Sequence, residues 1–147
     1  MKNIIVVTGG VGFIGSNLIE FLLKKTSKKK ILSIDNYKYG SKKNEIKNNR
    51  ATYINGDTKD ISKILNKYKK NIDTIFHFGE YARIHQSFKD HEECMATNVS
   101  GTSEILKFCV KNDIRIIYSA TSASLGNKGN DQYLSPYAFT KARNLQT

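Results

Sequence analysis

The sequence predicts an α/β domain, in which a doubly wound parallel sheet is covered by helices on both faces. Two observations predict it. Short apolar runs of strand length alternate with longer helical patterns along the chain, and the four central residues of the first run, residues 3–8, are all Ile or Val. A strand that is buried on both faces requires such a run, and burial on both faces is typical of parallel sheets.

Five strands alternate with helices in this pattern. The strand candidates are rich in Ile, Val or aromatic residues, and they are residues 3–8, 30–34, 51–54, 74–78 and 114–118. Helical patterns cover residues 13–25, 61–68 and about 92–111, and the last of these is expected to bury Ala96, Val99, Leu106 and Val110. A final helix opens at Ser135 and Pro136, because Ser is a good N-cap residue and Pro suits the first helical position.

The chain is expected to be one domain, residues 1–147, because no repeat, low-complexity segment or Pro/Gly-rich linker divides it. The final helical pattern reaches the last residue without a stop signal, so we expect a truncation before a C-terminal substrate-binding part. No apolar stretch has the length of a membrane span, and no small-residue cleavage site follows the apolar start. These features predict a cytoplasmic protein with no membrane partner.

The formal net charge of +11 favours anionic ligands, which include nucleic acid and phosphorylated metabolites. The densest cluster of lysines lies between Lys24 and Lys30 without interleaved aromatic residues, which favours a solvated helix end over a nucleic-acid patch. Cys94 and Cys109 have neither a disulfide-framework pattern nor zinc-ligand spacing, so we expect a reducing compartment and no metal. His77 and His85 lack a suitably spaced third ligand, and His77 is expected to be a packed, hydrogen-bonded strand residue.

A turn with glycines at positions 9, 12 and 15 joins the first strand to the first helix. Gly9 permits the tight turn, Gly12 lets the backbone approach a pyrophosphate, and Gly15 lets helix and strand pack closely. The N–H groups of the helix would face the phosphates. At a strand-to-helix junction this spacing predicts a Rossmann-type dinucleotide site.

An acid follows this turn at the distance that such a site needs. Asp35 lies twenty residues past Gly15, at the end of the second strand, where a carboxylate can accept hydrogen bonds from an adenosine ribose. It indicates NAD rather than NADP, although Lys38 is close by. The alternative is that Asp35 and Asn36 only cap a turn after the strand.

A second group of polar residues lies near the end of the chain. Tyr137 and Lys141 are four residues apart on one face of the last helix, and a neighbouring ammonium favours the phenolate form of a tyrosine. Tyr137 could then exchange a proton with a substrate hydroxyl. A hydroxyl-rich run, residues 118–126, follows the fifth strand at the sheet edge where open α/β folds bind ligands.

These motifs together resemble the extended short-chain dehydrogenase/reductases, specifically the NAD-dependent nucleotide-sugar epimerase/dehydratase family. The resemblance covers essentially the whole chain. Besides the glycine turn and Asp35-Asn36, the matching segments are Gly56-Asp57, residues 77–80, residues 98–102 and residues 135–141.

The resemblance implies NAD as the cofactor, a nucleotide sugar as the substrate and a homodimer in the full-length form. It implies that Thr121, five residues before Gly126, hydrogen-bonds the reacting hydroxyl, that Tyr137 is the base and acid, and that Lys141 supports Tyr137 and holds the nicotinamide ribose. The implied cofactor-binding residues are Gly9, Gly12, Phe13, Ile14, Gly15, Asp35, Asn36, Asp57, Thr58, Phe78, Gly79, Asn98, Tyr137 and Lys141. The implied substrate-binding residues are Glu80, Thr121 and Ser122.

Two departures from the family pattern bear on the reaction. Ser122 and Ala123 stand where the dehydratases carry an Asp-Glu pair, which favours epimerisation by transient oxidation over loss of water. Glu80 replaces a small residue and could contact substrate, pair with Arg83 or alter the pocket. A reductase or dehydratase of the same family is the alternative, and rivals from other classes are a non-catalytic NAD-binding regulatory protein and a basic nucleic-acid-binding domain.

Overall fold

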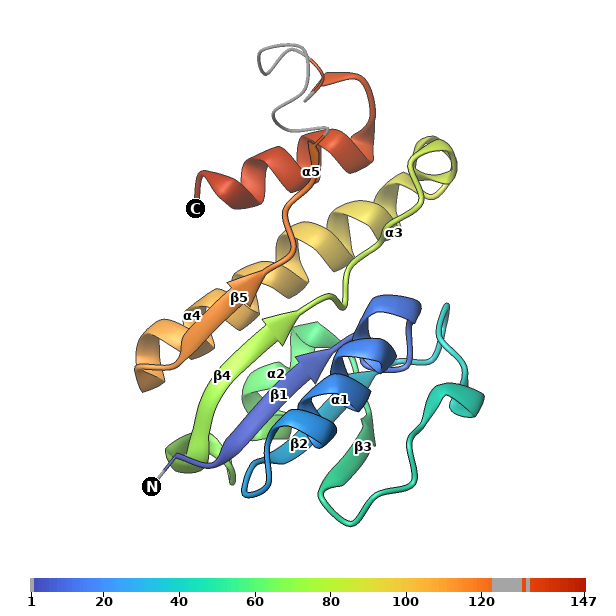
Figure 1. The fold of residues 1–147 in the computed structure, drawn as a ribbon. Helices are drawn as coiled ribbons and strands as arrows, with labels where there is room; N and C mark the ends of the chain where they lie inside the picture. The colour runs from blue at the N-terminus through green and yellow to red at the C-terminus, as the bar shows by residue number, and fades with distance from the viewer. Residues whose placement is uncertain (1, 123–130, 132) are drawn as a thin grey trace.

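Five parallel strands form one sheet, in the order β3-β2-β1-β4-β5, within the part of the chain that the computed structural model describes, residues 2–122, 131 and 133–147 (Figure 1). The strands are β1 (Ile4–Thr8), β2 (Lys30–Asp35), β3 (Ala51–Asn55), β4 (Ile72–His77) and β5 (Arg115–Tyr118). The predicted fold class is confirmed, and the predicted strands agree with these bounds to within about two residues.

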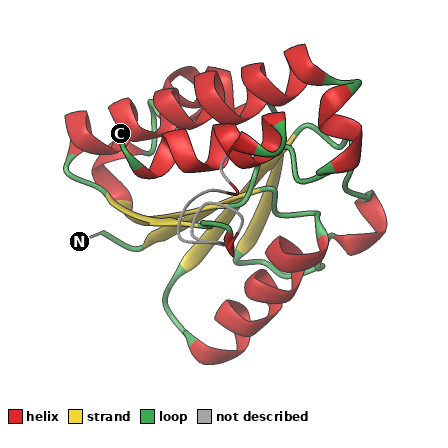
Figure 2. Ribbon diagram, turned by 90° about the horizontal axis from the view of Figure 1, so that it is seen from above, coloured by secondary structure: helices red, strands yellow, loops and turns green. Residues whose placement is uncertain are grey.

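Helices lie on both faces of this sheet, as Figure 2 shows in the view from above. They are α1 (Phe13–Lys25), α2 (Ile61–Leu65), α3 (His91–Met95), α4 (Thr102–Asn112) and α5 (Pro136–Leu145). The predicted start of α5 is confirmed, since the Ser135 hydroxyl accepts a hydrogen bond of 3.0 Å from the Ala138 N–H and Pro136 is the first helical residue.

The apolar core divides into two clusters, one on each face of the sheet. Along β1, Ile4 and Val6 belong to the cluster that includes residues of α2 and α4, whereas Ile5 and Val7 belong to the cluster with Ile19 of α1. Because successive side chains of a strand point to opposite faces, β1 is buried on both sides. The uninterrupted Ile/Val run is thereby explained.

The structure corrects the predicted buried face of residues 92–111. These residues form α3 and α4 joined through a π-helical segment, Ala96–Gly101, and Val110 is 83% exposed. The buried face instead passes through Asn98, Thr102 and Ile105. Asn98 and Thr102 are polar and hydrogen-bonded inside the protein, and Ile105, Phe108 and Cys109 continue the same face into the apolar core. Ala96, Val99 and Leu106 are only partly buried.

The strand order places the point where the chain reverses direction across the sheet at β1 and β4. The chain passes from β1 outward to β2 and β3, then returns to form β4 beside β1 and β5 beyond it. In open parallel sheets the crevice at the carboxyl ends of the strands on either side of such a point is where ligands bind. The glycine turn follows β1, and Glu80 follows β4, so both lie at this crevice.

Candidate functional site

A cavity of about 560 Å³ lies at the carboxyl edge of the sheet. All of the predicted cofactor-binding residues except Asn98 line it, and so does Glu80. The lining comes from the segments that follow all five strands, because the carboxyl ends of parallel strands meet at one edge. The sequence therefore predicted most of the lining from separate motifs.

The glycine turn forms the part of the cavity beside β1. Gly9 has φ +71°, and a Cβ atom there would lie 2.8 Å from the backbone of Phe78 and Gly79, so only glycine fits. A Cβ atom on Gly15 would lie 2.2 Å from the Gly9 carbonyl oxygen, so Gly15 lets α1 pack closely against the turn that follows β1. Within the described part of the chain, no side chain caps α1 at Gly12, so its first N–H groups are available to an anion.

Asp35 lines the cavity and also holds the backbone around it. Its carboxylate accepts hydrogen bonds from the Val11 N–H at 3.1 Å and from the Tyr37 N–H at 2.8 Å. The turn-capping interpretation of Asp35 is thus correct as far as it goes. It does not exclude ribose binding, because the two carboxylate oxygens offer about four acceptor positions and two are used.

The order of the strands gives the cavity a direction. Asp57 follows β3 and Asp35 ends β2, the glycine turn follows β1, and Ser119 follows β5. An uncapped helix end thus lies between a carboxylate-lined half and a half lined by Ser119, Tyr137 and Lys141. These residues fit a dinucleotide with its adenosine beside β2 and β3, its phosphates at α1 and its second nucleoside beside β4 and β5.

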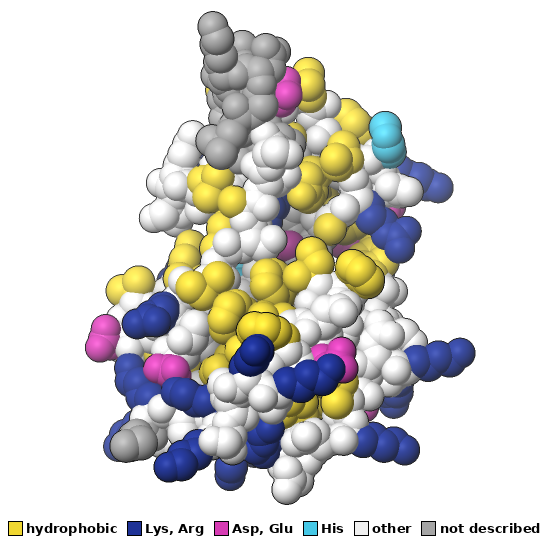
Figure 3. All heavy atoms as spheres, in the orientation of Figure 1, with side chains coloured by type: hydrophobic (Ala, Val, Ile, Leu, Met, Phe, Trp, Pro, Cys, Tyr) yellow, Lys and Arg dark blue, Asp and Glu magenta, His cyan; other side chains and the backbone are white. Residues whose placement is uncertain are grey.

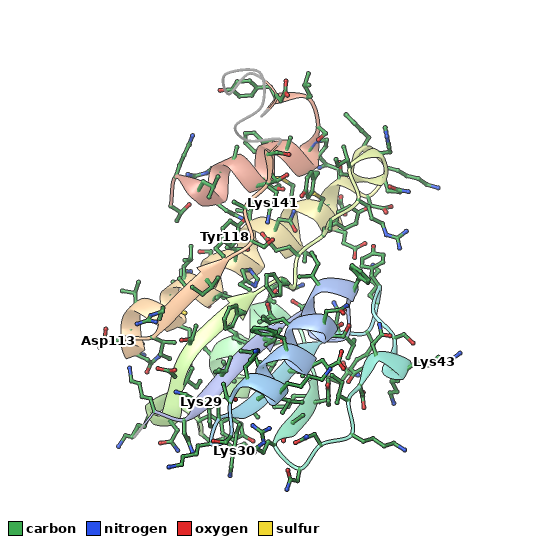
Figure 4. All side chains as sticks on the ribbon, viewed as in Figure 1. Lys29, Lys30, Lys43, Asp113, Tyr118 and Lys141 are labelled. Atoms are coloured by element: carbon green, nitrogen blue, oxygen red, sulfur yellow. The ribbon has the colours of Figure 1, made fainter. Side chains whose placement is uncertain are left out.

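Tyr137 and Lys141 lie on α5 and both line the second half of the cavity. The Tyr137 N–H donates to the Ser87 hydroxyl at 3.2 Å. The Lys141 ammonium donates to the Ser119 carbonyl oxygen and to Glu80, and it lies 4.4 Å from the centre of the Tyr118 ring. Figure 4 shows Lys141 and Tyr118 close together where α5 passes over the end of β5.

Glu80 is buried at the centre of this second half. Its side chain and that of Lys141 are each 4% exposed, and the two form an ion pair. The other carboxylate oxygen accepts hydrogen bonds from the Tyr118 hydroxyl at 3.0 Å, the Thr102 hydroxyl at 3.1 Å and the Asn144 amide at 3.1 Å. Pairing with Arg83 was one expectation for Glu80, but within the described residues its ion-pair partner is Lys141, which the sequence did not indicate.

His77 continues this network into the sheet, and its predicted role as a packed, hydrogen-bonded residue is confirmed. Its Nε2 lies 2.9 Å from the Thr102 hydroxyl and its Nδ1 lies 2.7 Å from the Thr8 hydroxyl. Burial, followed by the nearby charge of Lys141, lowers the pKa of His77 from 6.5 to about 3. His77 is therefore neutral in the folded protein at physiological pH.

Three predicted site residues lie outside the lining of the cavity. Asn98 is fully buried, and its side chain holds both the N–H and the carbonyl oxygen of Tyr81 and also donates to the Thr140 hydroxyl at 3.0 Å. Thr121 and Ser122 directly follow Ala120, which does line the cavity. The roles predicted for these three residues stay predictions, and Gly126, from which Thr121 was assigned, lies outside the described residues.

The cavity has further lining residues that the sequence did not single out. Tyr39 and Tyr81 meet edge to face with their ring centres 5.8 Å apart, and both line the cavity together with Glu93, whose carboxylate pairs with Lys38 at 2.6 Å. Tyr39 lies four residues after Asp35, beyond the carboxyl end of β2. This position could have indicated Tyr39 as a lining residue, because the loops at this edge of the sheet carry the ligand contacts.

The lysine cluster predicted to be solvated lies away from the cavity. Figure 4 places Lys29 and Lys30 at the opposite end of the sheet from Lys141, and Figure 3 shows Lys and Arg side chains around the same lower part of the molecule. Lys24 pairs with Glu20 at 2.6 Å on the exposed face of α1.

Within the described residues, no group of His, Cys, Asp or Glu could hold a metal ion. Over the same part of the chain, no helix combines the length and apolarity that crossing a membrane requires.

Comparison with known proteins relates this site to a family. A family model described as the NAD-dependent epimerase/dehydratase family matches residues 5–146. An uncharacterised protein of Methanocaldococcus jannaschii, MJ1055, is 32% identical to this chain. The match covers 97% of this chain and 49% of that protein. A dTDP-D-glucose 4,6-dehydratase of Dictyostelium discoideum is 31% identical over 84% of this chain and 30% of its own length.

A solved structure is similar over nearly the whole chain. The UDP-N-acetylglucosamine 4-epimerase of Methanobrevibacter ruminantium M1, solved in complex with UDP-N-acetylmuramic acid, is 31% identical with a TM-score of 0.81. The match covers 98% of this chain and 49% of that one. The chain therefore spans about half the length of these proteins, or less.

Proposed function

Because the chain belongs to the NAD-dependent epimerase/dehydratase family, with NAD as its cofactor, we propose that it is the cofactor-binding half of an enzyme that epimerises a nucleotide sugar, in the manner of a UDP-glucose 4-epimerase. One observation carries this proposal. A single cavity has an uncapped helix end and Asp35 on one side and Tyr137 with Lys141 on the other. Residues that suit binding and residues that suit proton transfer thus face the same space.

The residues of the first half fit the adenosine and phosphates of NAD. The glycine turn exposes backbone N–H groups of α1, and Asp35 retains acceptor positions for ribose hydroxyls. A 2′-phosphate on that ribose would meet the charge of Asp35, which favours NAD over NADP. Asp57 and Thr58 line this end of the cavity.

The residues of the second half suit reversible oxidation of a sugar hydroxyl. Bound NAD supplies a reversible hydride acceptor there. Tyr137 takes the proton from the hydroxyl at its phenolic oxygen and later returns it. We assign Thr121 to hold the reacting hydroxyl, as the sequence resemblance implies, and Ser122 and Glu80 to the substrate side of the site.

Epimerisation is preferred to dehydration for a reason of side-chain chemistry. Elimination of water needs an acid and a base besides Tyr137, and the two positions where dehydratases of the family carry them are Ser122 and Ala123 here. Ala123 lies outside the described residues. Dehydration is the alternative reaction, because the relative from Dictyostelium discoideum is a dehydratase.

For the whole protein we also propose a homodimer in the cytoplasm.

The proposed reaction is tested with the protein as its gene encodes it. Incubation with NAD and UDP-glucose, followed by NMR analysis of the sugar, is expected to give the C4-inverted sugar with no net accumulation of NADH. Formation of a deoxy-keto sugar would instead identify a dehydratase. Stoichiometric NADH would identify a net dehydrogenase, and either result would contradict epimerisation.

A further inference from the structure

Glu80 stands out because it is a buried carboxylate next to Lys141 at the proposed nicotinamide end of the cavity. All four of its side-chain partners are donors: the Lys141 ammonium, the hydroxyls of Tyr118 and Thr102, and the Asn144 amide. A carboxylate can accept all of these hydrogen bonds, and with the Lys141 ammonium it forms a buried ion pair. The pair therefore consists of one full negative and one full positive charge.

The neighbouring hydroxyls and His77 are oriented to suit this negative charge. The Thr102 hydroxyl donates its hydrogen to Glu80, so its oxygen accepts from the Nε2–H of His77. Nδ1 of His77 is then the acceptor for the Thr8 hydroxyl. The Thr8 oxygen in turn accepts the Gly79 N–H at 3.0 Å. In this arrangement each hydrogen points along the chain of bonds toward Glu80, which suits a carboxylate at its end.

The same pair fixes where the Lys141 ammonium lies. An ammonium has three N–H groups, and Glu80 and the Ser119 carbonyl oxygen accept two of them. Lys141 also lines the cavity. Among the described residues no other acceptor holds Lys141, so its third N–H can serve a hydroxyl of a ligand in the cavity, while Glu80 and Ser119 hold the nitrogen in place.

The nicotinamide ring carries a positive charge in NAD⁺ and none in NADH, so it responds to nearby charges. Without Glu80, the charge of Lys141 would repel the oxidised ring and leave the reduced ring unaffected. We propose that Glu80 is the counter-ion and positioning residue of Lys141, which lets this lysine bind the cofactor without disfavouring its oxidised form. This inference rests on the proposed binding of NAD in the cavity.

The experiment measures the dissociation constants of NAD⁺ and NADH for the protein as its gene encodes it, by calorimetry and by NADH fluorescence. The quantity of interest is the NADH constant divided by the NAD⁺ constant. Glu80→Gln is expected to lower this ratio about 10-fold, because a unit charge near the ring is lost. If Glu80 served folding alone, its loss would weaken the binding of NAD⁺ and of NADH equally. An unchanged ratio in a variant that still binds would therefore overturn the proposal.

Three further variants complete the test. Lys141→Met leaves Glu80 unopposed and is expected to raise the ratio about 10-fold, and the double variant is expected to return it close to the wild-type value. If Glu80→Gln does not fold, an unchanged ratio in Lys141→Met overturns the proposal. Glu104→Gln is the matched control, because Glu104 pairs with Lys107 at 2.8 Å on the surface, and its ratio is expected to be that of the wild type.

A failure of the proposed function gives a different result. If the wild-type protein binds neither NAD⁺ nor NADH, the assignment of the cavity is wrong, and the inference on Glu80 is wrong with it. If the wild type binds both and the ratio does not respond to Glu80→Gln or Lys141→Met, only the role of Glu80 is wrong.

Discussion

Lowering the pH from 7 to 5 is expected to destabilise this protein through His77. The pKa of His77 is about 3 in the folded state and 6.5 at its ordinary value. Below pH 6.5 the unfolded chain takes up a proton that the folded protein does not, so the free energy of unfolding falls as the pH falls, down to about pH 3. The loss between pH 7 and pH 5 is ~2 kcal/mol, out of a total of ~5 kcal/mol.

Urea unfolding at pH 7 and pH 5 measures this loss. Carboxylates and other groups also contribute, so the wild type is compared with His77→Gln, which has no group that titrates here. The wild type is expected to lose ~2 kcal/mol more than this variant. His85→Gln, at an exposed position, is the control and is expected to behave as the wild type. Equal losses in the wild type and His77→Gln would refute the buried neutral histidine, as would protonation of the His77 ring in ¹⁵N NMR spectra at pH 5.

Three other substitutions test the cavity and the reaction. Gly9→Ala is expected to cost at least about 2 kcal/mol of stability in urea unfolding, since φ is +71° and the added Cβ meets backbone; a wild-type midpoint would contradict the turn geometry. Asp35→Ala is expected to weaken NAD binding about 10-fold in calorimetry, and an unaltered dissociation constant would refute the ribose contact. Tyr137→Phe in the protein as its gene encodes it is expected to abolish epimerisation while NAD affinity stays within about threefold, and unchanged turnover would exclude Tyr137 as the base.

The sequence was sufficient for the parts of this fold that depend on local chemistry. Glycine spacing predicted the turn because its geometry forbids side chains at Gly9 and Gly15, and an Ile/Val run predicted β1 because both faces of that strand are buried. The start of α5 followed from the cap at Ser135. Each of these features depends on a stretch of no more than about ten consecutive residues.

Features that depend on distant partners could not be predicted in this way. Glu80 and Lys141 are 61 residues apart, and nothing in either segment indicates the ion pair. In residues 92–111 the buried side chains include Asn98 and Thr102, whose hydrogen-bond partners lie on other segments, and the predicted Val110 is exposed. Polar residues of this kind are buried where other segments supply their hydrogen bonds, and apolar periodicity does not identify them.

The central claim is that the cavity binds NAD with its phosphates at the start of α1, and Gly12→Ala tests it most directly. A Cβ atom at Gly12 would have the Gly9 carbonyl oxygen as its nearest neighbour, at 3.2 Å, so the variant is expected to fold. The added methyl group would stand where the backbone must approach the phosphates. Calorimetry is expected to show saturable 1:1 binding of NAD to the wild type and at least about 10-fold weaker binding to the folded variant. No binding to the wild type, or equal binding to both proteins, would contradict the account.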